Sequence, residues 1–121
     1  MKIPGPDHPI TITPTRKRIR ISAGGIVVAD TTRALTLKEA AYPAVQYIPR
    51  DDAEIGKLVR TDRVTHCPYK GDANYFSIRA GERLIDNAIW TYEQPYPAMA
   101  EIAGHLAFYP DKVTIEELPL P

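Results

Sequence analysis

Apolar and polar residues alternate with a period of two along most of this chain, which is the pattern of half-buried β-strands. The alternation begins at residues 18–21, and a β-branched, apolar run follows at 25–30. Between these segments, residues 23–25 supply two glycines that tolerate positive φ, so the two runs are predicted to form a hairpin. The same pattern predicts further strands at residues 34–39, 45–48, 63–67, 74–79, 84–85, 88–92, 105–109 and 113–117.

Two segments interrupt the strand pattern and favour short helices. Asp51, with Glu54 three residues later, matches a capping box, and the apolar residues that follow share one face, which predicts a helix over 51–59. Pro97 suits the first turn of a second helix, over 97–103. About ten short strands and two short helices predict a mainly β fold, built as a small antiparallel barrel or folded sheet.

Proline separates the two ends of the chain from its middle. Half of the 12 prolines fall within the first 14 and the last three residues, where the rigid ring resists both helix and central strand. We therefore expect an extended N-terminal arm at 1–15, a single globular domain at 16–117 and a C-terminal tail at 118–121. The arm is expected either to be disordered or to pack over a neighbouring subunit.

The composition excludes several classes of protein. The chain has 121 residues, a formal net charge of zero and one cysteine, so it has no internal disulfide and no multi-thiolate zinc site. Zero net charge gives no overall attraction to nucleic acid, and the basic run at 16–20 is more typical of a solvated strand edge. No apolar stretch is long enough to span a membrane, and the N-terminus lacks the apolar segment of a secretory signal, which predicts a cytoplasmic protein.

Side chains that could bind a ligand or take part in a reaction are most concentrated at residues 65–75. The thiol of Cys67 stands next to His66 in sequence, but neighbouring residues of a strand point to opposite faces, so His66 is not expected to act as its base. Lys70, in the following turn, is the better neighbour, because its charge would favour a thiolate or bind an anionic ligand directly. The alternative is that Cys67 is a small buried apolar residue and Lys70 a solvated turn residue.

Several short motifs follow one another along the chain. They are GIVVAD at 25–30, Glu39 followed by Tyr47 and Pro49, CPYKG at 67–71 followed by Tyr75, Trp90 with Tyr92 and Pro95, and GHLAFY at 104–109. Over about residues 16–117, they resemble the bacterial and fungal family named domain of unknown function 427. The resemblance implies a small fold of the β-tent kind, similar to the Mss4-like folds, and a homodimer. It implies no established activity.

The side chains at these positions predict a shared cleft. The residues expected to line it are Glu39, Tyr47, Cys67, Lys70, Tyr75, Arg79 and Trp90. Lys70 and Arg79 would hold an anionic group, while Trp90 and Tyr47 would stack on a flat or apolar body. Glu39 would orient a donor or act as an acid or base. The alternatives are that the aromatic residues fill the core, and that Glu39 is a surface charge or part of a structural salt bridge.

Two classes of function stay open. The leading one is a domain that binds, or acts on, a small anionic ligand around Cys67, Lys70 and Glu39. The other is a non-catalytic dimeric interaction module, in which the same residues brace the fold; uncovered strand edges also favour a homodimer.

Nucleotidyl transfer, a label given to some members of the family, is a third and weaker hypothesis. It normally requires a Gly-Ser turn and paired carboxylates for metal ions. The chain has no Gly-Ser, and its Asp51-Asp52 pair suits helix capping. The G-x-x-x-x-G-K and G-x-G-x-x-G phosphate-binding patterns are also absent, so no cofactor is predicted.

Overall fold

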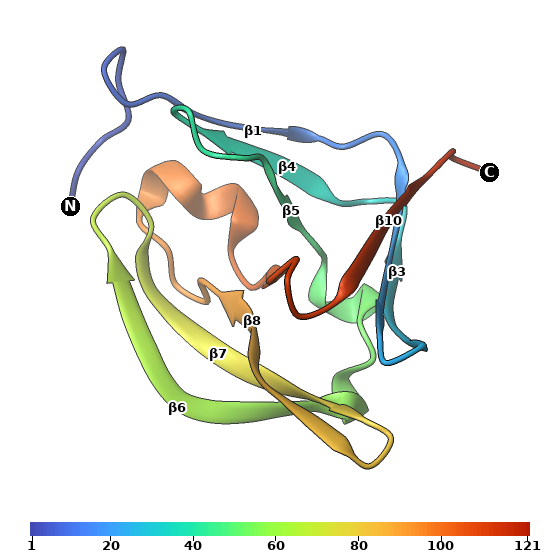
Figure 1. Ribbon diagram of the computed structural model, residues 1–121. Helices are drawn as coiled ribbons and strands as arrows, with labels where there is room; N and C mark the ends of the chain where they lie inside the picture. Colours follow the sequence, from blue (N-terminus) through green and yellow to red (C-terminus); the bar gives the residue numbers. More distant parts are fainter.

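The computed structural model describes all 121 residues and confirms a mainly β protein, with ten antiparallel strands in three open sheets (Figure 1). The first sheet contains β1 (Ile10–Pro14), β4 (Leu35–Glu39) and β5 (Val45–Tyr47). The second contains β10 (Thr114–Leu118), β2 (Arg18–Ala23) and β3 (Ile26–Thr31). The third contains β6 (Leu58–Cys67), β7 (Gly71–Ala80), β8 (Arg83–Thr91) and β9 (Leu106–Phe108).

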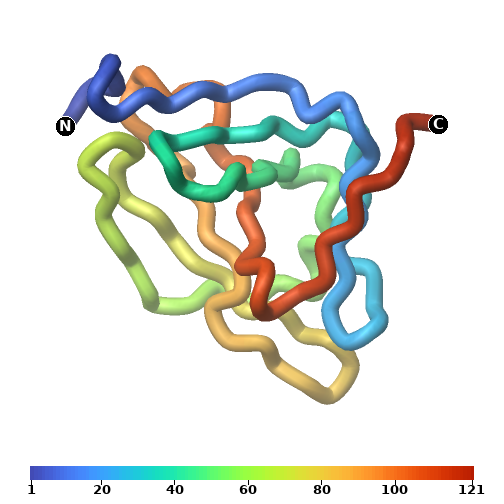
Figure 2. The backbone as a smooth tube through the Cα atoms, turned by 45° about the horizontal axis from the view of Figure 1, so that its top comes forward, coloured from blue at the N-terminus to red at the C-terminus, as the bar shows by residue number.

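The three sheets surround a common interior. In Figure 1 the first sheet runs along the top, β3 and β10 stand at the right, and β6 to β8 form the lower part, with the turn between β7 and β8 at the lower right. Figure 2 shows the same enclosure from another side, with the two ends of the chain on opposite sides of the molecule. The first and third sheets are joined by an isolated bridge, in which Ile48 and Leu106 exchange two backbone hydrogen bonds of 2.8 Å.

The prediction of a helix over 51–59 is wrong. Its place is taken by two 3-10 turns, η1 (Arg50–Asp52) and η2 (Ile55–Lys57), and β6 begins at once with Leu58. The backbone here pairs with β3 instead of forming a helix: Ala53 forms a bridge with Ala29, and the Glu54 N–H donates to the Val28 carbonyl at 2.8 Å. These contacts replace the helix that the capping box favours.

The second predicted helix is present within one residue of its expected bounds, but as a 3-10 segment. This segment, η3 (Pro97–Ile102), begins with proline and buries Met99 and Ile102. Met99 has φ of −110° and ψ of 18°, which breaks the helical geometry in the middle of the segment. None of the helical segments is long and apolar enough to cross a membrane.

The N-terminal segment, expected as a free or partner-bound arm, packs on its own domain. Residues 10–14 form β1, which pairs with β4 from Ile10–Glu39 to Pro14–Leu35. Further towards the N-terminus, the Lys2 N–H donates to the Pro68 carbonyl at 2.7 Å, beside the turn between β6 and β7. Residues 1–15 therefore help to cover the region around the β6–β7 turn.

The buried side chains form two clusters, and β7 contributes to both. The larger cluster holds Ile78 and Ala80 from the second half of β7, whereas the smaller one holds Ala73 and Tyr75 from its first half. The register of β7 against β8 shifts between Phe76 and Ile78. A β-bulge of this kind moves the inward-facing positions from odd to even residue numbers, so one strand can serve two clusters.

Truncation of the larger cluster tests this packing. Ile89 of β8 is completely buried, so Ile89→Ala is expected to lower the free energy of unfolding by about 3 kcal/mol, through lost burial and a residual cavity. Leu84→Ala, on the same strand but at an exposed position, should change it by less than about 0.5 kcal/mol. Urea denaturation measures both. Equal effects of the two substitutions would contradict the assigned core.

Candidate functional site

A cavity of about 220 Å³ lies between the first and third sheets, against the smaller cluster. Most of its wall is aromatic or aliphatic, and a single pair of opposite charges interrupts that wall. The lining residues are Leu37, Glu39, Tyr42, Pro43, Val45, Tyr47, Lys70, Tyr75, Trp90, Tyr92 and Tyr109. A concave, mainly apolar wall with a few polar groups is the usual form of a small-molecule site.

The charged pair consists of Lys70 and Glu39. The Lys70 ammonium donates to Glu39 Oε1 at 2.5 Å, and the two side chains are 7% and 18% exposed. The other carboxylate oxygen, Oε2, lies 2.8 Å from His8 Nε2. Burial alone would raise the pKa of Glu39, but the hydrogen bonds from Lys70 and His8 outweigh it and hold that pKa below its ordinary value.

Three separate parts of the chain position this pair. Glu39 ends β4, and β1 fixes it by pairing Ile10 with Glu39. Lys70 lies in the turn before β7, where its carbonyl accepts from the Tyr96 N–H at 2.9 Å. Gly71, the next residue, has φ of +108°, a backbone conformation that favours glycine over residues with a side chain.

The Lys70 ammonium retains hydrogen-bonding capacity. An ammonium carries three N–H donors, and its two protein partners are Glu39 and the Cys67 sulfur, the latter at 3.8 Å. One donor is therefore left on a side chain that is more than nine-tenths buried and lines the cavity.

Two buried tyrosines add hydroxyl groups to the same wall. Tyr47 accepts a hydrogen bond from Trp90 Nε1 at 3.3 Å, so its own O–H stays free to donate. Tyr92 is 7% exposed, and its hydroxyl has no hydrogen-bond partner in the protein. Burial raises the pKa of both residues well above the ordinary tyrosine value, which keeps both hydroxyls protonated.

Another part of the wall is built from aromatic rings that contact one another at tilted and edge-on angles. Trp90 and Tyr109 have ring centroids 4.6 Å apart, and Tyr47 meets Trp90 edge-on at 6.5 Å. The Tyr109 hydroxyl donates to the Tyr75 hydroxyl at 3.4 Å. Burial raises the pKa of Tyr109 to about 12, and its hydrogen bond to Tyr75 acts in the same direction.

The pKa of Tyr75 is shifted in the opposite direction from those of Tyr47, Tyr92 and Tyr109. Burial opposes its ionisation, yet hydrogen bonds with Thr65 and Tyr109, and then the nearby Arg63, hold its pKa below the ordinary value. The Arg63 guanidinium lies 4.8 Å from the Tyr75 ring centroid. Tyr75 thus connects the cavity to a charged group on the outside of β6.

Five of the seven residues predicted from the sequence line this cavity: Glu39, Tyr47, Lys70, Tyr75 and Trp90. Cys67 does not line it, but lies half-buried behind Lys70, in contact with the ammonium. His66 is turned away from Cys67, as strand alternation predicts, and its ring nitrogen lies 2.8 Å from Asp72 on an exposed surface.

Arg79 does not belong to the cavity. It is exposed on the second half of β7, beyond the register shift between Phe76 and Ile78. Strict alternation would place residue 79 on the same face as Tyr75, but the bulge reverses the faces between them. Arg79 is therefore not placed to hold an anion in this cavity, and that part of the sequence-based prediction is wrong.

The sequence analysis missed two tyrosines whose signals were available. Tyr92 stands two residues after Trp90, which is the spacing of side chains on one face of a strand. Tyr109 closes the last motif of the chain, and its ring packs at a tilt against Trp90. A third missed element, the segment that contains Tyr42 and Pro43, connects β4 to β5 and carries no regular pattern.

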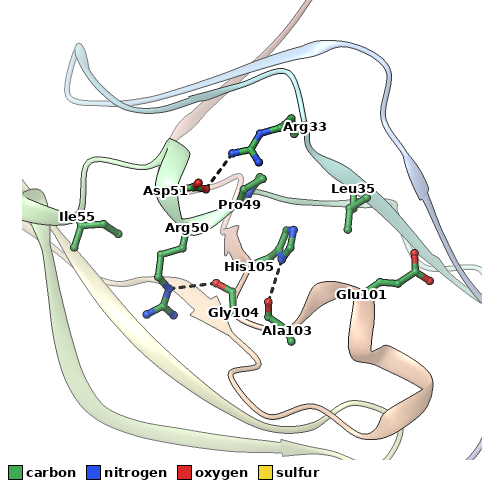
Figure 3. A pocket seen from close by; sticks show the side chains of 10 residues that line it. All are labelled: Arg33, Leu35, Pro49, Arg50, Asp51, Ile55, Glu101, Ala103, Gly104 and His105. Atoms are coloured by element: carbon green, nitrogen blue, oxygen red, sulfur yellow. Dashed lines mark hydrogen bonds and ion pairs between the residues drawn. The ribbon is translucent and has the colours of Figure 1, made fainter.

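A larger hollow, of about 840 Å³, lies near η1 and the residues before β9 (Figure 3). Its two arginines already have protein partners: Arg33 pairs with Asp51 at 3.0 Å, and Arg50 donates to the Gly104 carbonyl at 3.2 Å. The Asp51 carboxylate thus binds an arginine in place of a helix N-terminus, and no side chain caps η1. With these groups satisfied, the smaller cavity is the stronger candidate site.

The fold and the cavity together define a small, mainly β domain with an aromatic-walled pocket around a buried ion pair. The family model NTP_transf_9, described as domain of unknown function (DUF427), matches residues 11–118, and the chain belongs to this family. A comparison with curated proteins found no match.

The Glu39–Lys70 pair gives stability a defined dependence on pH. Because folding lowers the pKa of Glu39, its contribution is complete above the ordinary value of about 4.5 and is lost as the pH falls through the lower folded pKa. Glu39→Gln is expected to lower the free energy of unfolding by about 3 kcal/mol at pH 7, since it leaves a buried ammonium without its counter-ion.

Urea denaturation between pH 7 and pH 3 measures this effect, and the difference between wild type and Glu39→Gln should shrink below about pH 4.5. The exposed Glu82→Gln serves as the matched control and should stay close to wild type throughout. A constant difference across the whole pH range would show that the carboxylate charge of Glu39 does not stabilise the fold.

Proposed function

We propose that this domain binds a small organic acid, whose carboxylate enters the cavity beside Lys70. The observation that carries the proposal is the set of unused hydrogen-bond donors on its wall. The Lys70 ammonium has one donor left, and the Tyr92 hydroxyl has no partner in the protein. Every fully buried side-chain nitrogen and oxygen has a partner in the protein, so the Tyr92 hydroxyl is accessible from the cavity. A ligand that accepts hydrogen bonds from both groups would replace their contacts with solvent.

The donors select the chemistry of the ligand. Lys70, Tyr47 and Tyr92 can all donate into one cavity of about 220 Å³. A carboxylate is the matching group, because it only accepts hydrogen bonds and has two oxygens to share among several donors. Bonds from a cation or a hydroxyl to an anionic oxygen are also stronger than those between neutral groups.

Glu39 sets the strength of this interaction. Its carboxylate supplies the counter-ion of the buried Lys70 ammonium. The same carboxylate cancels most of the Lys70 charge, so the bound acid is recognised by directed hydrogen bonds more than by net charge. The aromatic wall of Trp90 and Tyr109 then holds the apolar part of the ligand.

Binding is better supported than turnover. Cys67, the only thiol, lies behind Lys70 and not on the cavity wall. Both oxygens of Glu39 are already engaged, with Lys70 and His8, which leaves that carboxylate poorly placed to accept a proton from a ligand.

Titration with a panel of small carboxylic acids tests the proposal, with the corresponding primary amides as uncharged controls. Trp90 is the only tryptophan of the chain and lines the cavity, so its fluorescence reports occupancy directly. Acids are expected to bind and to raise the melting temperature, whereas their amides should bind much more weakly.

Tyr92→Phe should weaken acid binding about tenfold or more, the effect of removing one hydrogen bond to a charged group. Its fold should be unaffected, because the hydroxyl has no partner within the protein. Tyr96→Phe is the matched control, since Tyr96 does not line the cavity. If acids and amides bind equally, or if Tyr92→Phe leaves acid affinity unchanged, the proposal is wrong.

A further inference from the structure

A second hollow of about 730 Å³ adjoins the cavity, and both are lined by Tyr42, Pro43, Val45 and Trp90. This second hollow, the groove, is lined by Tyr42, Pro43, Ala44, Val45, Gln46, Trp90, Phe108, Pro110, Ile115 and Glu117. Trp90 therefore stands at the junction, with the Lys70–Glu39 pair on one side and the groove on the other.

The groove differs from the cavity in its chemistry. Its wall contains the apolar side chains of Phe108, Pro110 and Ile115, and neither lysine nor arginine. It offers no positive charge to an anion: Gln46, whose carbonyl oxygen accepts from Thr15 at 2.6 Å, is neutral, and Glu117 is itself acidic. A second carboxylate is disfavoured here, while an uncharged apolar chain fits.

The rim of the groove is held in place. Residues 40–44 connect β4 to β5, and the Lys38 ammonium donates to the carbonyls of Ala40 and Tyr42 within this connection. The Tyr42 ring is nevertheless 62% exposed. A fixed backbone with an exposed aromatic side chain at the junction of the two hollows is a preformed contact surface for a ligand.

We propose that the ligand is an amphipathic monocarboxylic acid, whose carboxylate binds beside Lys70 and whose apolar chain passes Trp90 and lies in the groove. This inference rests on the proposed function and adds the class of ligand. The cavity alone, at about 220 Å³, is smaller than the roughly 300–1,000 Å³ of typical small-molecule sites, and the adjoining groove, which shares four lining residues with it, offers further space.

A series of straight-chain acids from butanoate to decanoate tests the inference, followed by Trp90 fluorescence and calorimetry. Each methylene that enters the groove should tighten binding about fourfold, until the groove is filled. Decanedioate, which carries a second carboxylate, should bind much more weakly than decanoate, because that end would meet Glu117.

The substitution Ala44→Asp tests the contribution of the groove separately from that of the cavity. Ala44 is exposed and lines the groove but not the cavity, so the substitution places a charge beside the apolar chain without disturbing the core. It should remove the gain with chain length while leaving butanoate affinity within about twofold of wild type. The neighbouring Ala41→Asp, which is exposed and lines neither hollow, is the matched control.

The outcomes separate the two proposals. If the acids bind with an affinity that does not depend on chain length, the carboxylate site beside Lys70 is supported, but the proposed binding of the apolar chain in the groove is wrong. Decanol that binds as tightly as decanoate, with no effect of Tyr92→Phe, would overturn the acid site itself and with it the class of ligand. If Ala44→Asp changes the sedimentation mass but not the affinity for acids, a second copy of the chain covers the groove and the inference fails.

Discussion

The buried contact between Lys70 and Glu39 is the constraint on which the site depends. Removing an ammonium and a carboxylate from water carries a large desolvation penalty, which is repaid only when the two groups meet in good geometry and their remaining hydrogen-bonding positions are used. Glu39 meets this condition through His8, whereas Lys70 keeps an unused donor. The pair therefore forces three distant segments together and also leaves one interaction open at the cavity wall.

The bulge in β7 explains how so small a domain contains both a core and a cavity. Up to Tyr75 the inward side chains of β7 face the smaller cluster and the cavity, and from Ile78 onward they fill the larger cluster. Without the register shift, one face of the strand would have to serve both. The larger cluster, which includes the fully buried Ile89 and Ile48, supplies a rigid support against which the cavity residues are held.

Much of this could be predicted from the sequence, and the failures have physical causes. Period-two alternation identifies the strands because it reports burial on one face, and motif positions brought Glu39, Lys70 and Trp90 together correctly. Arg79 was misplaced because a one-residue bulge leaves no mark on hydrophobicity yet reverses every later side chain. The 51–59 helix failed because backbone pairing of Ala53 with Ala29 is a long-range interaction that no local pattern contains.

The free donors of the cavity are hard to explain by stability alone. Tyr92 packs in the smaller cluster, and a phenylalanine there would fill nearly the same space without a hydroxyl to desolvate. The Tyr47 hydroxyl is similar, because its oxygen accepts a hydrogen bond from Trp90 while its own O–H has no acceptor in the protein. Proteins depart from the local rules of stability chiefly at functional sites. Two hydroxyls without an acceptor in the protein and one remaining N–H of the Lys70 ammonium, on the wall of one cavity, form a pattern that core packing does not require and that an anionic oxygen would complete.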